Sequence, residues 1–230
     1  GDGFVGIANV FDDILLYRRK TLFRITGTSP ENYQMKQIPA SCGAVGPDAI
    51  ANNGRYSFYI GNDGIYSYDG IRASIIENNR LRFLFENRIN RNKLAISCAV
   101  IFDNKLYAAV PADGSAHNNL IIEYDIDSRV FNIRSGMNVS KFVVFNNQLL
   151  FSGNDGFIYT FDNSIKYNGA NITAHYETPY CDFQNKNMLK TLDSVCFTAK
   201  GTGSVKISAE TERGTVSKTV TLKRSSDFDI

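Results

Sequence analysis

The sequence predicts an all-β protein made of β-propeller blades, each a four-stranded antiparallel meander. One observation is a unit of apolar strand, two-residue polar turn and apolar strand that recurs four times. A second is the spacing of these units, whose turns end at positions 13, 54, 104 and 147, at intervals of 41, 50 and 43 residues. A period of roughly 40–50 residues built from strands is typical of radial sheet repeats.

Each unit begins with a predicted hairpin. The hairpins span residues 7–17, 49–58, 99–108 and 142–151, and their turns are predicted at Asp12-Asp13, Asn53-Gly54, Asp103-Asn104 and Asn146-Asn147. Asn, Asp and Gly are favoured there because they tolerate the positive φ that a tight hairpin requires. The strand before each turn is almost entirely apolar, as in residues 142–145, so we expect neighbouring blades to cover both of its faces.

Further strands complete each blade. They are predicted at residues 21–25 in the first blade, 65–68 and 71–76 in the second, 120–125 and 129–133 in the third, and 157–161 in the fourth. The connecting turns are predicted at residues 27–30, 61–64, Asp69-Gly70, the longer loop 111–119, 153–156 and Asp162-Asn163. Together these strands place about four blades, part of a larger propeller, in residues 1–170.

A helical pattern interrupts the strands at residues 79–94. Leu81, Leu84, Phe85 and Ile89 lie at helical spacing, and the insertion explains the longest interval between turns. A helix on the propeller rim with a solvated basic face is the simpler interpretation, and a helix that contacts a partner is the alternative. The candidate partner contacts are Arg80, Arg82, Arg88 and Arg91 in this segment and Arg18, Arg19 and Lys20 in a predicted hairpin turn.

The pattern changes after residue 170. Strands are predicted at residues 172–178, 192–199, 205–211 and 216–223, with the Thr, Ser and Val content and alternation of a half-exposed antiparallel sheet. Residues 171–230 are therefore expected to form a small β-sandwich-like domain, cut short at its C-terminus.

The residues that could act in catalysis or bind a metal have simpler structural explanations. Asp12, Asp13, Asp69 and Asp125 occupy turn positions, where carboxylates bond their own backbone. His117 and His175 belong to no triad signature, and no phosphate-binding glycine motif is present. The four cysteines, Cys42, Cys98, Cys181 and Cys196, form no metal-ligand spacing and are expected to be reduced and mostly buried. The sequence thus predicts no enzyme activity, no catalytic residues, no cofactor and no metal.

The order of these segments resembles a β-propeller family of phage virion proteins from the neck and tail. The resembling stretches are residues 10–19, 22–27, 61–70, 118–125 and 176–183. The resemblance implies a non-enzymatic structural subunit of a phage or prophage tail or neck, assembled in the bacterial cytoplasm into a ring. The ring is expected to be hexameric and to surround a channel that carries DNA only as cargo. The resemblance also implies neighbouring tail or neck subunits as partners, a location in the virion, and more propeller before Gly1.

Composition is consistent with that implication and leaves two alternatives. A formal charge of +2 gives no field for nucleic-acid binding, and no apolar run is long enough to span a membrane. The alternative function is a carbohydrate-binding or glycoside-active surface propeller, for which Tyr56, Tyr59, Tyr66 and Tyr68 would present rings to a sugar. A scaffold propeller that binds peptides is a third option.

Overall fold

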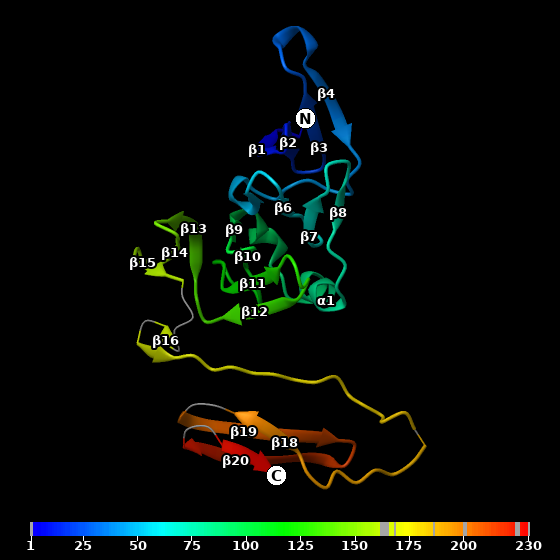
Figure 1. Cartoon of the computed structure of the whole chain (residues 1–230), viewed down its shortest axis with the longest axis vertical. Coiled ribbons are helices and arrows are strands. Elements are labelled where there is room, and N and C mark those ends of the chain that lie inside the picture. The colour runs from blue at the N-terminus through cyan, green and yellow to red at the C-terminus, as the bar shows by residue number, and fades with distance from the viewer. Residues whose placement is uncertain are drawn as a thin grey trace. The chain divides into compact units, whose positions relative to one another are not determined.

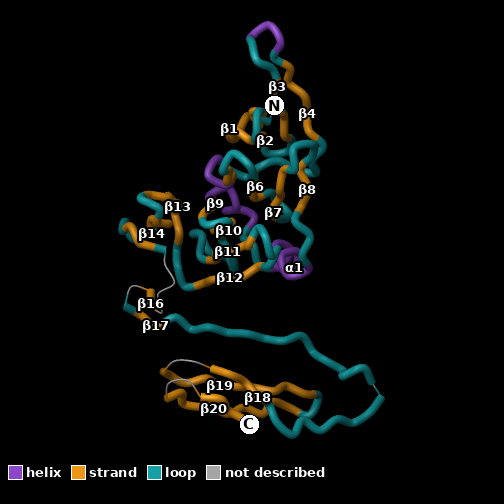
Figure 2. Tube along the Cα trace, in the orientation of Figure 1, coloured by secondary structure: helices purple, strands orange, loops and turns teal. Residues whose placement is uncertain are grey.

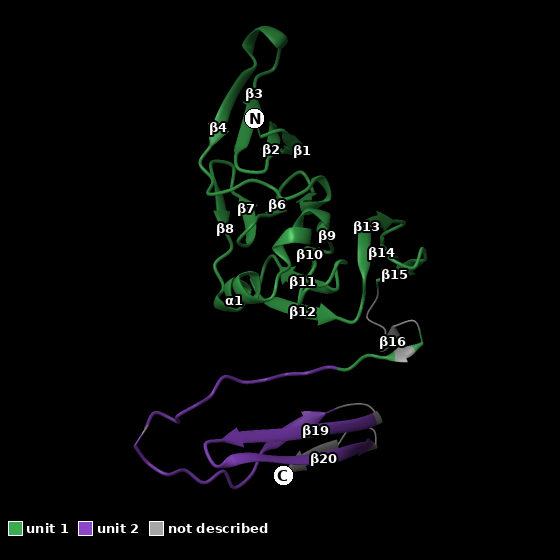
Figure 3. Cartoon of the chain, turned by 180° about the vertical axis from the view of Figure 1, so that it is seen from behind, with its two compact units in different colours: residues 1–173 green, residues 174–230 purple. Residues whose placement is uncertain are grey.

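A computed structural model describes residues 2–161, 166–167, 169–185, 187–199, 202–223 and 226–229. The chain divides into two compact units, Gly1–Thr173 and Ala174–Ile230, drawn in different colours in Figure 3. The sequence placed its domain boundary after residue 170. The predicted turn at Asp162-Asn163 lies outside the described residues.

Unit 1 contains four antiparallel meanders that follow one another along the chain (Figure 1). Sheet 1 consists of β1 (Phe4–Val10), β2 (Asp13–Arg18), β3 (Leu22–Thr26) and β4 (Gln34–Ile38). Sheet 2 consists of β5 (Ile50–Asn52), β6 (Ser57–Ile60), β7 (Ile65–Tyr68) and β8 (Ala73–Ile75). Sheet 3 consists of β9 (Cys98–Phe102), β10 (Lys105–Val110), β11 (Leu120–Asp125) and β12 (Phe131–Ser135), and sheet 4 of β13 (Val139–Phe145), β14 (Gln148–Gly153) and β15 (Ile158–Thr160). The all-β class with several four-stranded antiparallel sheets is therefore confirmed.

Two of the four predicted hairpin turns are confirmed. Phe102 pairs with Lys105 and Phe145 pairs with Gln148, which leaves Asp103-Asn104 and Asn146-Asn147 as two-residue turns. All four turn residues have φ between 47° and 58°. This conformation matches the right-handed twist of the two strands that the turn joins.

The other two predicted turns are each displaced by one residue. Val10 pairs with Asp13, so the first turn is Phe11-Asp12, and Asp13 belongs to the ladder, where its carboxylate lies 3.4 Å from Arg24 Nη1. In the second hairpin the Asn53 N–H donates to the Tyr56 carbonyl (3.3 Å), which leaves Gly54-Arg55 as the turn.

Asn53 determines where this second turn falls. Its Oδ1 accepts hydrogen bonds from the N–H groups of Arg55 (3.2 Å) and Tyr56 (2.8 Å). Asp69 repeats the arrangement, because its Oδ1 accepts from the N–H groups of Ile71 and Arg72, and β8 starts only at Ala73. An Asn or Asp side chain of this kind mimics a backbone turn, so it stands before the tight turn and not within it.

The four sheets stack in chain order. Their first strands are neighbours, since β1 contacts β5, β5 contacts β9 and β9 contacts β13, and Val10 and Gly54 form a parallel bridge. One apolar core lies between sheets 1 and 2, a second between sheets 2 and 3, and a third between sheets 3 and 4. A strand whose sheet is covered on both faces has consecutive buried residues, and β6, β10 and β11 have such runs.

The expectation that the first strand of every sheet is covered on both faces is wrong for β13. Val143, Val144 and Phe145 are exposed, and so are Phe4 and Ile7 in β1. The continuously buried strands are the second and third strands of the middle sheets. Sheets 1 and 4 each have a neighbour on one face only within the described chain, and this accounts for the difference.

The insertion is helical over a shorter range than the sequence pattern indicates. α1 spans Asn79–Asn87, and a 3-10 helix follows at Arg91–Ile96 (Figure 2). Asn78 begins α1, because its side chain accepts hydrogen bonds from the N–H groups of Arg80 and Leu81. Leu81, Leu84 and Phe85 are buried in the core that sheets 2 and 3 share.

The remaining short elements connect the sheets. Two 3-10 turns span Pro30–Asn32 and Pro47–Ala49, and β16 (Lys166–Tyr167) pairs with β17 (Ala170–Asn171). None of the described helices has the length and apolar run that crossing a bilayer would require.

Unit 2 contains two separate antiparallel pairs. β18 (Cys196–Ala199) pairs with β21 (Ser226–Asp229), and β19 (Thr202–Thr211) pairs with β20 (Gly214–Lys223). The predicted strand at residues 172–178 is absent, and these residues are exposed. Among the described side chains of this unit, Leu222 alone is buried. With so little apolar burial on either side of the segment, alternation by itself does not form a strand.

Candidate interaction surfaces

In the predicted basic turn, Arg18 is packed against aromatic rings, and Arg19 and Lys20 are exposed. The Arg18 guanidinium carbon lies 4.8 Å from the centroid of the Phe4 ring and 5.5 Å from that of the Phe23 ring, as in cation–π contacts. Arg19 and Lys20 are exposed at the turn. Arg18 N–H donates to the Thr21 carbonyl (2.9 Å) and closes the turn.

The four arginines of the helical segment also fall into two groups, one bonded within the protein and one open. Arg88 forms a bidentate pair with Asp113, with Nε to Oδ1 at 3.0 Å and Nη2 to Oδ2 at 2.7 Å, and these hydrogen bonds lower the pKa of Asp113. Arg91 Nη2 donates to the Phe85 carbonyl near the helix C-terminus (3.4 Å).

Arg80 and Arg82 are the other pair in this segment. Both side chains are exposed, and neither has an ion-pair partner among the described residues. Of the seven sequence-predicted contacts, Arg19, Lys20, Arg80 and Arg82 are therefore the four with cationic groups open to a partner. The structure does not bring the two groups together, because one lies on sheet 1 and the other on α1 (Figure 1).

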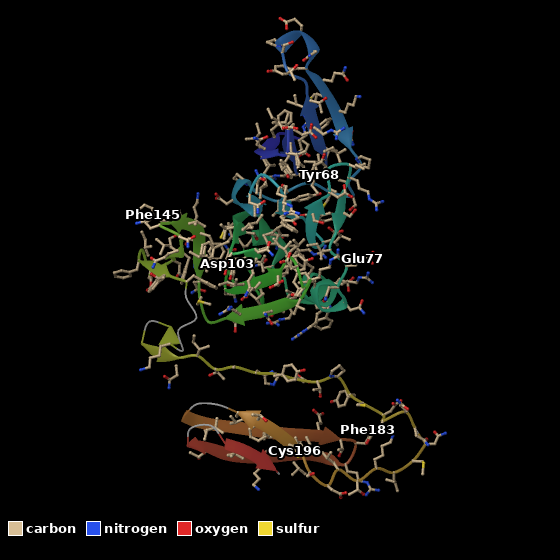
Figure 4. The ribbon with its side chains drawn as sticks, viewed as in Figure 1. Tyr68, Glu77, Asp103, Phe145, Phe183 and Cys196 are labelled. Carbon is tan, nitrogen blue, oxygen red and sulfur yellow. The ribbon has the colours of Figure 1, made fainter. Side chains whose placement is uncertain are left out.

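A groove beside α1 has mixed charge. It encloses about 240 Å³ and is lined by Arg82 together with Asp63, Glu77 and Glu86. The sequence pattern already set Glu77 and Glu86 against the arginines of this segment, but it did not predict that Asp63 approaches them from the β6–β7 turn. Figure 4 labels Glu77, which lies where the chain enters α1.

A second depression lies where the turns of three sheets meet. It encloses about 360 Å³. Its lining residues are Asn53, Ile101, Phe102, Asp103, Asn104, Val144 and Asn147. The polar members belong to the turns of the second, third and fourth hairpins, which stacking brings to one place. Sequence reasoning assigned these residues to turns and gave no signal that the turns converge.

The tyrosines proposed to present rings to a sugar are mostly core residues. Tyr59, Tyr66 and Tyr68 are buried, and only Tyr56 is partly exposed. Tyr59 stacks on Tyr66 with ring centroids 5.1 Å apart, and Tyr17 contacts Tyr59 edge-on. Their hydroxyls bond inside the protein, as when Tyr59 donates to the Cys42 carbonyl (2.9 Å). These rings fill the space between sheets 1 and 2, so that part of the carbohydrate hypothesis is wrong.

A buried ion network lies in sheet 3. Glu123 is 3% exposed, and its carboxylate accepts from Lys105 Nζ (2.8 Å) and from Arg134 Nε (2.8 Å). Burial alone would raise the pKa of Glu123, but the hydrogen bonds from both cations outweigh it and the net pKa is lowered. Arg134 also lies over the Phe161 ring, 5.3 Å from its centroid. The network is fully satisfied and fixes strands β10, β11 and β12 to one another.

The remaining titratable residues that the structure describes have separate structural roles or are exposed. Asp69 and Asp125 accept backbone hydrogen bonds in their turns, which lower the pKa of each carboxyl. His117 and His175 are exposed. In the described ranges, no three His, Cys, Asp or Glu side chains are grouped so as to hold a metal ion. The expectation of mostly buried thiols is wrong, because Cys98 is buried and Cys42 partly so, whereas Cys181 and Cys196 are exposed.

Comparison with known proteins gives structural likeness only. No protein-family model and no curated protein matches the chain. The computationally designed Ika4 protein aligns at 10% identity over 70% of this chain and 91% of that one, with a TM-score of 0.46. BamB from Moraxella catarrhalis aligns at 9% identity over 70% of this chain and 45% of its own, with a TM-score of 0.45.

A third similar structure is PorZ from Porphyromonas gingivalis, described as an essential bacterial surface component of the type-IX secretion system. It aligns at 14% identity over 100% of this chain and 28% of its own, with a TM-score of 0.46. The chain thus spans less than half the length of BamB and of PorZ. Identities and scores this low carry no information on function. The class that the structure defines is an all-β protein of stacked antiparallel meanders.

Proposed function

We propose that the chain is a non-enzymatic structural subunit, built from propeller blades, of a phage or prophage tail or neck. It works through protein–protein contacts in a homo-oligomeric ring and is carried in the virion after assembly in the bacterial cytoplasm. The observation that carries the proposal is the placement of the polar side chains of unit 1. The buried polar groups described above, Glu123 and the tyrosine hydroxyls, hold sheets together, while the open cationic groups lie at a turn and on a helix outside the sheets.

Two further features support this proposal. Face-to-face stacking of meanders with neighbouring first strands is the arrangement that blades adopt in a propeller. The order of the strand and turn motifs also resembles that of phage neck and tail propellers. In one such motif, the side chains of Asn118 and Asn119 form hydrogen bonds to the backbone. Asn119 Oδ1 accepts from the Ala112 N–H (2.8 Å), and Asn118 Nδ2 donates to the carbonyls of Ile96 and Val139 (both 2.9 Å).

The test is quantitative mass spectrometry of particles purified after prophage induction in the source strain. We expect peptides of this chain in stoichiometric amounts relative to the capsid protein, and particles that lack a complete tail when its gene is deleted. Peptides found on the cell surface and absent from purified particles would contradict the proposal.

A pair of charge reversals tests the open arginines of α1. Arg80→Glu with Arg82→Glu is expected to reduce incorporation into particles at least tenfold, because a cationic surface of the subunit then carries the wrong sign for its neighbour. The matched control reverses two exposed cations elsewhere, Lys36→Glu with Arg55→Glu, and is expected to leave incorporation unchanged.

The second candidate function is a carbohydrate-binding surface propeller, and the depression where the turns meet favours it. Its amides and its one carboxylate, from Asn53, Asp103, Asn104 and Asn147, line it together with apolar side chains, and small-molecule sites combine apolar lining with a few polar groups in this way. A glycan array with the wild-type chain and an Asn147→Ala variant distinguishes the two functions. Binding that this variant abolishes would favour the second candidate, and an array without binding would favour the first.

A further inference from the structure

Sheets 1 and 4 each leave one apolar face uncovered. On sheet 1 this is the first-sheet face, made by Ile7, Ile14, Leu16, Phe23, Ile25 and Met35. On sheet 4 it is the fourth-sheet face, made by Val143, Phe145, Leu150 and Ile158. The members of each face are cross-strand partners or alternate along a strand, so they point to the same side.

These faces are open in the described chain. On the first-sheet face Ile7 is 67% exposed and Met35 59%, and on the fourth-sheet face Phe145 is 61% and Ile158 72%. Figure 4 labels Phe145 at the end of β13, on the margin of unit 1. Apolar side chains gathered on a flat sheet face mark a surface that another element covers.

The hairpin registers indicate which kind of element would cover these two faces. In the second strand of sheets 3 and 4, the residues two and four places from the turn face the preceding sheet. They are Leu106 and Ala108 in the core with sheet 2, and Leu149 and Phe151 in the core with sheet 3. The same positions of sheet 1 are Ile14 and Leu16, on the first-sheet face.

The other end of the stack follows the same rule. The residue three places from the turn faces the following sheet, as Leu15 does in the core with sheet 2 and Tyr107 in the core with sheet 4. In sheet 4 this position is Leu150, on the fourth-sheet face. Among the described residues, no sheet packs before sheet 1 or after sheet 4 in the way that the chain stacks sheets three times internally.

We propose that a second copy of this chain supplies both missing sheets, with the fourth-sheet face of each copy packed on the first-sheet face of the other. The contact continues the interface already repeated within the chain, and it joins two different faces, so two copies close on themselves through two equal contacts. Two sets of four sheets make eight, within the range of four to eight blades that closed radial arrays contain. Arg18 lies at the margin of this contact, over Phe4 and Phe23. The proposal does not depend on a role in a virion.

The test is the oligomeric state of the whole chain by sedimentation equilibrium at micromolar concentration. We expect a mass of twice 25.6 kDa. A first-sheet variant, Ile14→Lys with Met35→Lys, and a fourth-sheet variant, Val143→Lys with Ile158→Lys, are each expected to be monomeric. Because the substituted residues are exposed, circular dichroism should show both variants folded. The control Ile71→Lys alters an exposed residue outside both faces and should stay dimeric.

Mixing the two variants tests the pairing of unlike faces. Each variant keeps the face that the other lacks, so an equimolar mixture is expected to form a dimer through one contact. A wild-type chain that stays monomeric at 100 µM would overturn the proposal, and so would a fourth-sheet variant that still dimerises by itself, because like faces would then be paired.

Discussion

At the scale of single residues, the clearest stabilising group is the carboxylate of Glu123. It is desolvated between sheets, and two cations compensate for that desolvation with short hydrogen bonds. A satisfied buried network adds little over an apolar core, but it becomes costly when one member is lost. Its importance therefore lies in the penalty for removing its charge.

We expect Glu123→Gln to lower the free energy of unfolding by about 1–2 kcal/mol at pH 7, because Lys105 and Arg134, whose side chains are 35% exposed and partly solvated, then face a neutral group. The folded-state pKa of Glu123 is lowered, so its stabilisation is present above the unfolded pKa of about 4.3 and is lost as pH falls through the folded pKa. Urea titrations at pH 7 and pH 3 measure this. A difference between wild type and variant as large at pH 3 as at pH 7 would contradict the assignment.

The thiols give a second prediction at this scale. Burial raises the pKa of Cys98 to about 12, so its thiolate is scarce at neutral pH and a reagent cannot reach it. We expect iodoacetamide at pH 8 to modify the exposed Cys181 within minutes and Cys98 at least a hundredfold more slowly, as peptide mass spectrometry would measure. Equal rates in urea provide the control, and equal rates in the native protein would show that Cys98 is not buried.

At the scale of elements, the hairpins were predicted best, and the burial of their strands by neighbouring sheets was predicted worst. The pairs Asp103-Asn104 and Asn146-Asn147 determine their own backbone, so local sequence was sufficient. Asn53 and Asp69 use their side chains to move the turn one residue along the chain, which the Asn-Gly and Asp-Gly pairs do not reveal. Whether a strand is covered depends on its neighbours in space, and for this reason the exposure of β13 and the convergence of turns at one depression could not be read from the sequence.

The positive φ at Asn147 gives a prediction at the element scale. Glycine has no side-chain penalty at φ 58°, so Asn147→Gly is expected to stabilise unit 1 by about 0.5 kcal/mol, and a β-branched Asn147→Val to destabilise it by about 1–2 kcal/mol. Thermal unfolding of the two variants measures the difference. If the valine variant were as stable as wild type, the turn would not have the left-handed conformation described.

At the scale of the whole molecule, the two units differ in what holds them together. Unit 1 has three apolar cores, whereas among the described side chains of unit 2 only Leu222 is buried. A two-stranded pair is at most marginally stable in water by itself. The change in composition after residue 170 lies three residues before the division between the units. The small apolar burial among the described residues of the second unit could not be predicted, because alternating strands look alike with or without a partner face.

Hydrogen exchange tests this difference. Amides of β10 and β11 are expected to exchange at least a thousandfold more slowly than those of β19 and β20, since the former open only when unit 1 unfolds. Mass spectrometry of peptic fragments gives both rates in one experiment. Comparable protection in the two hairpins would mean that unit 2 has a core of its own or gains one from a neighbour.

The three stacking contacts of unit 1 each join sheets that are consecutive in the chain. Such an array is held together by nearest neighbours, so its energy grows step by step with each member added. A gene that duplicated one meander would lengthen the protein without rebuilding any existing contact. Evolution can therefore change the length of such a molecule by copying, while the members already present keep their sequences.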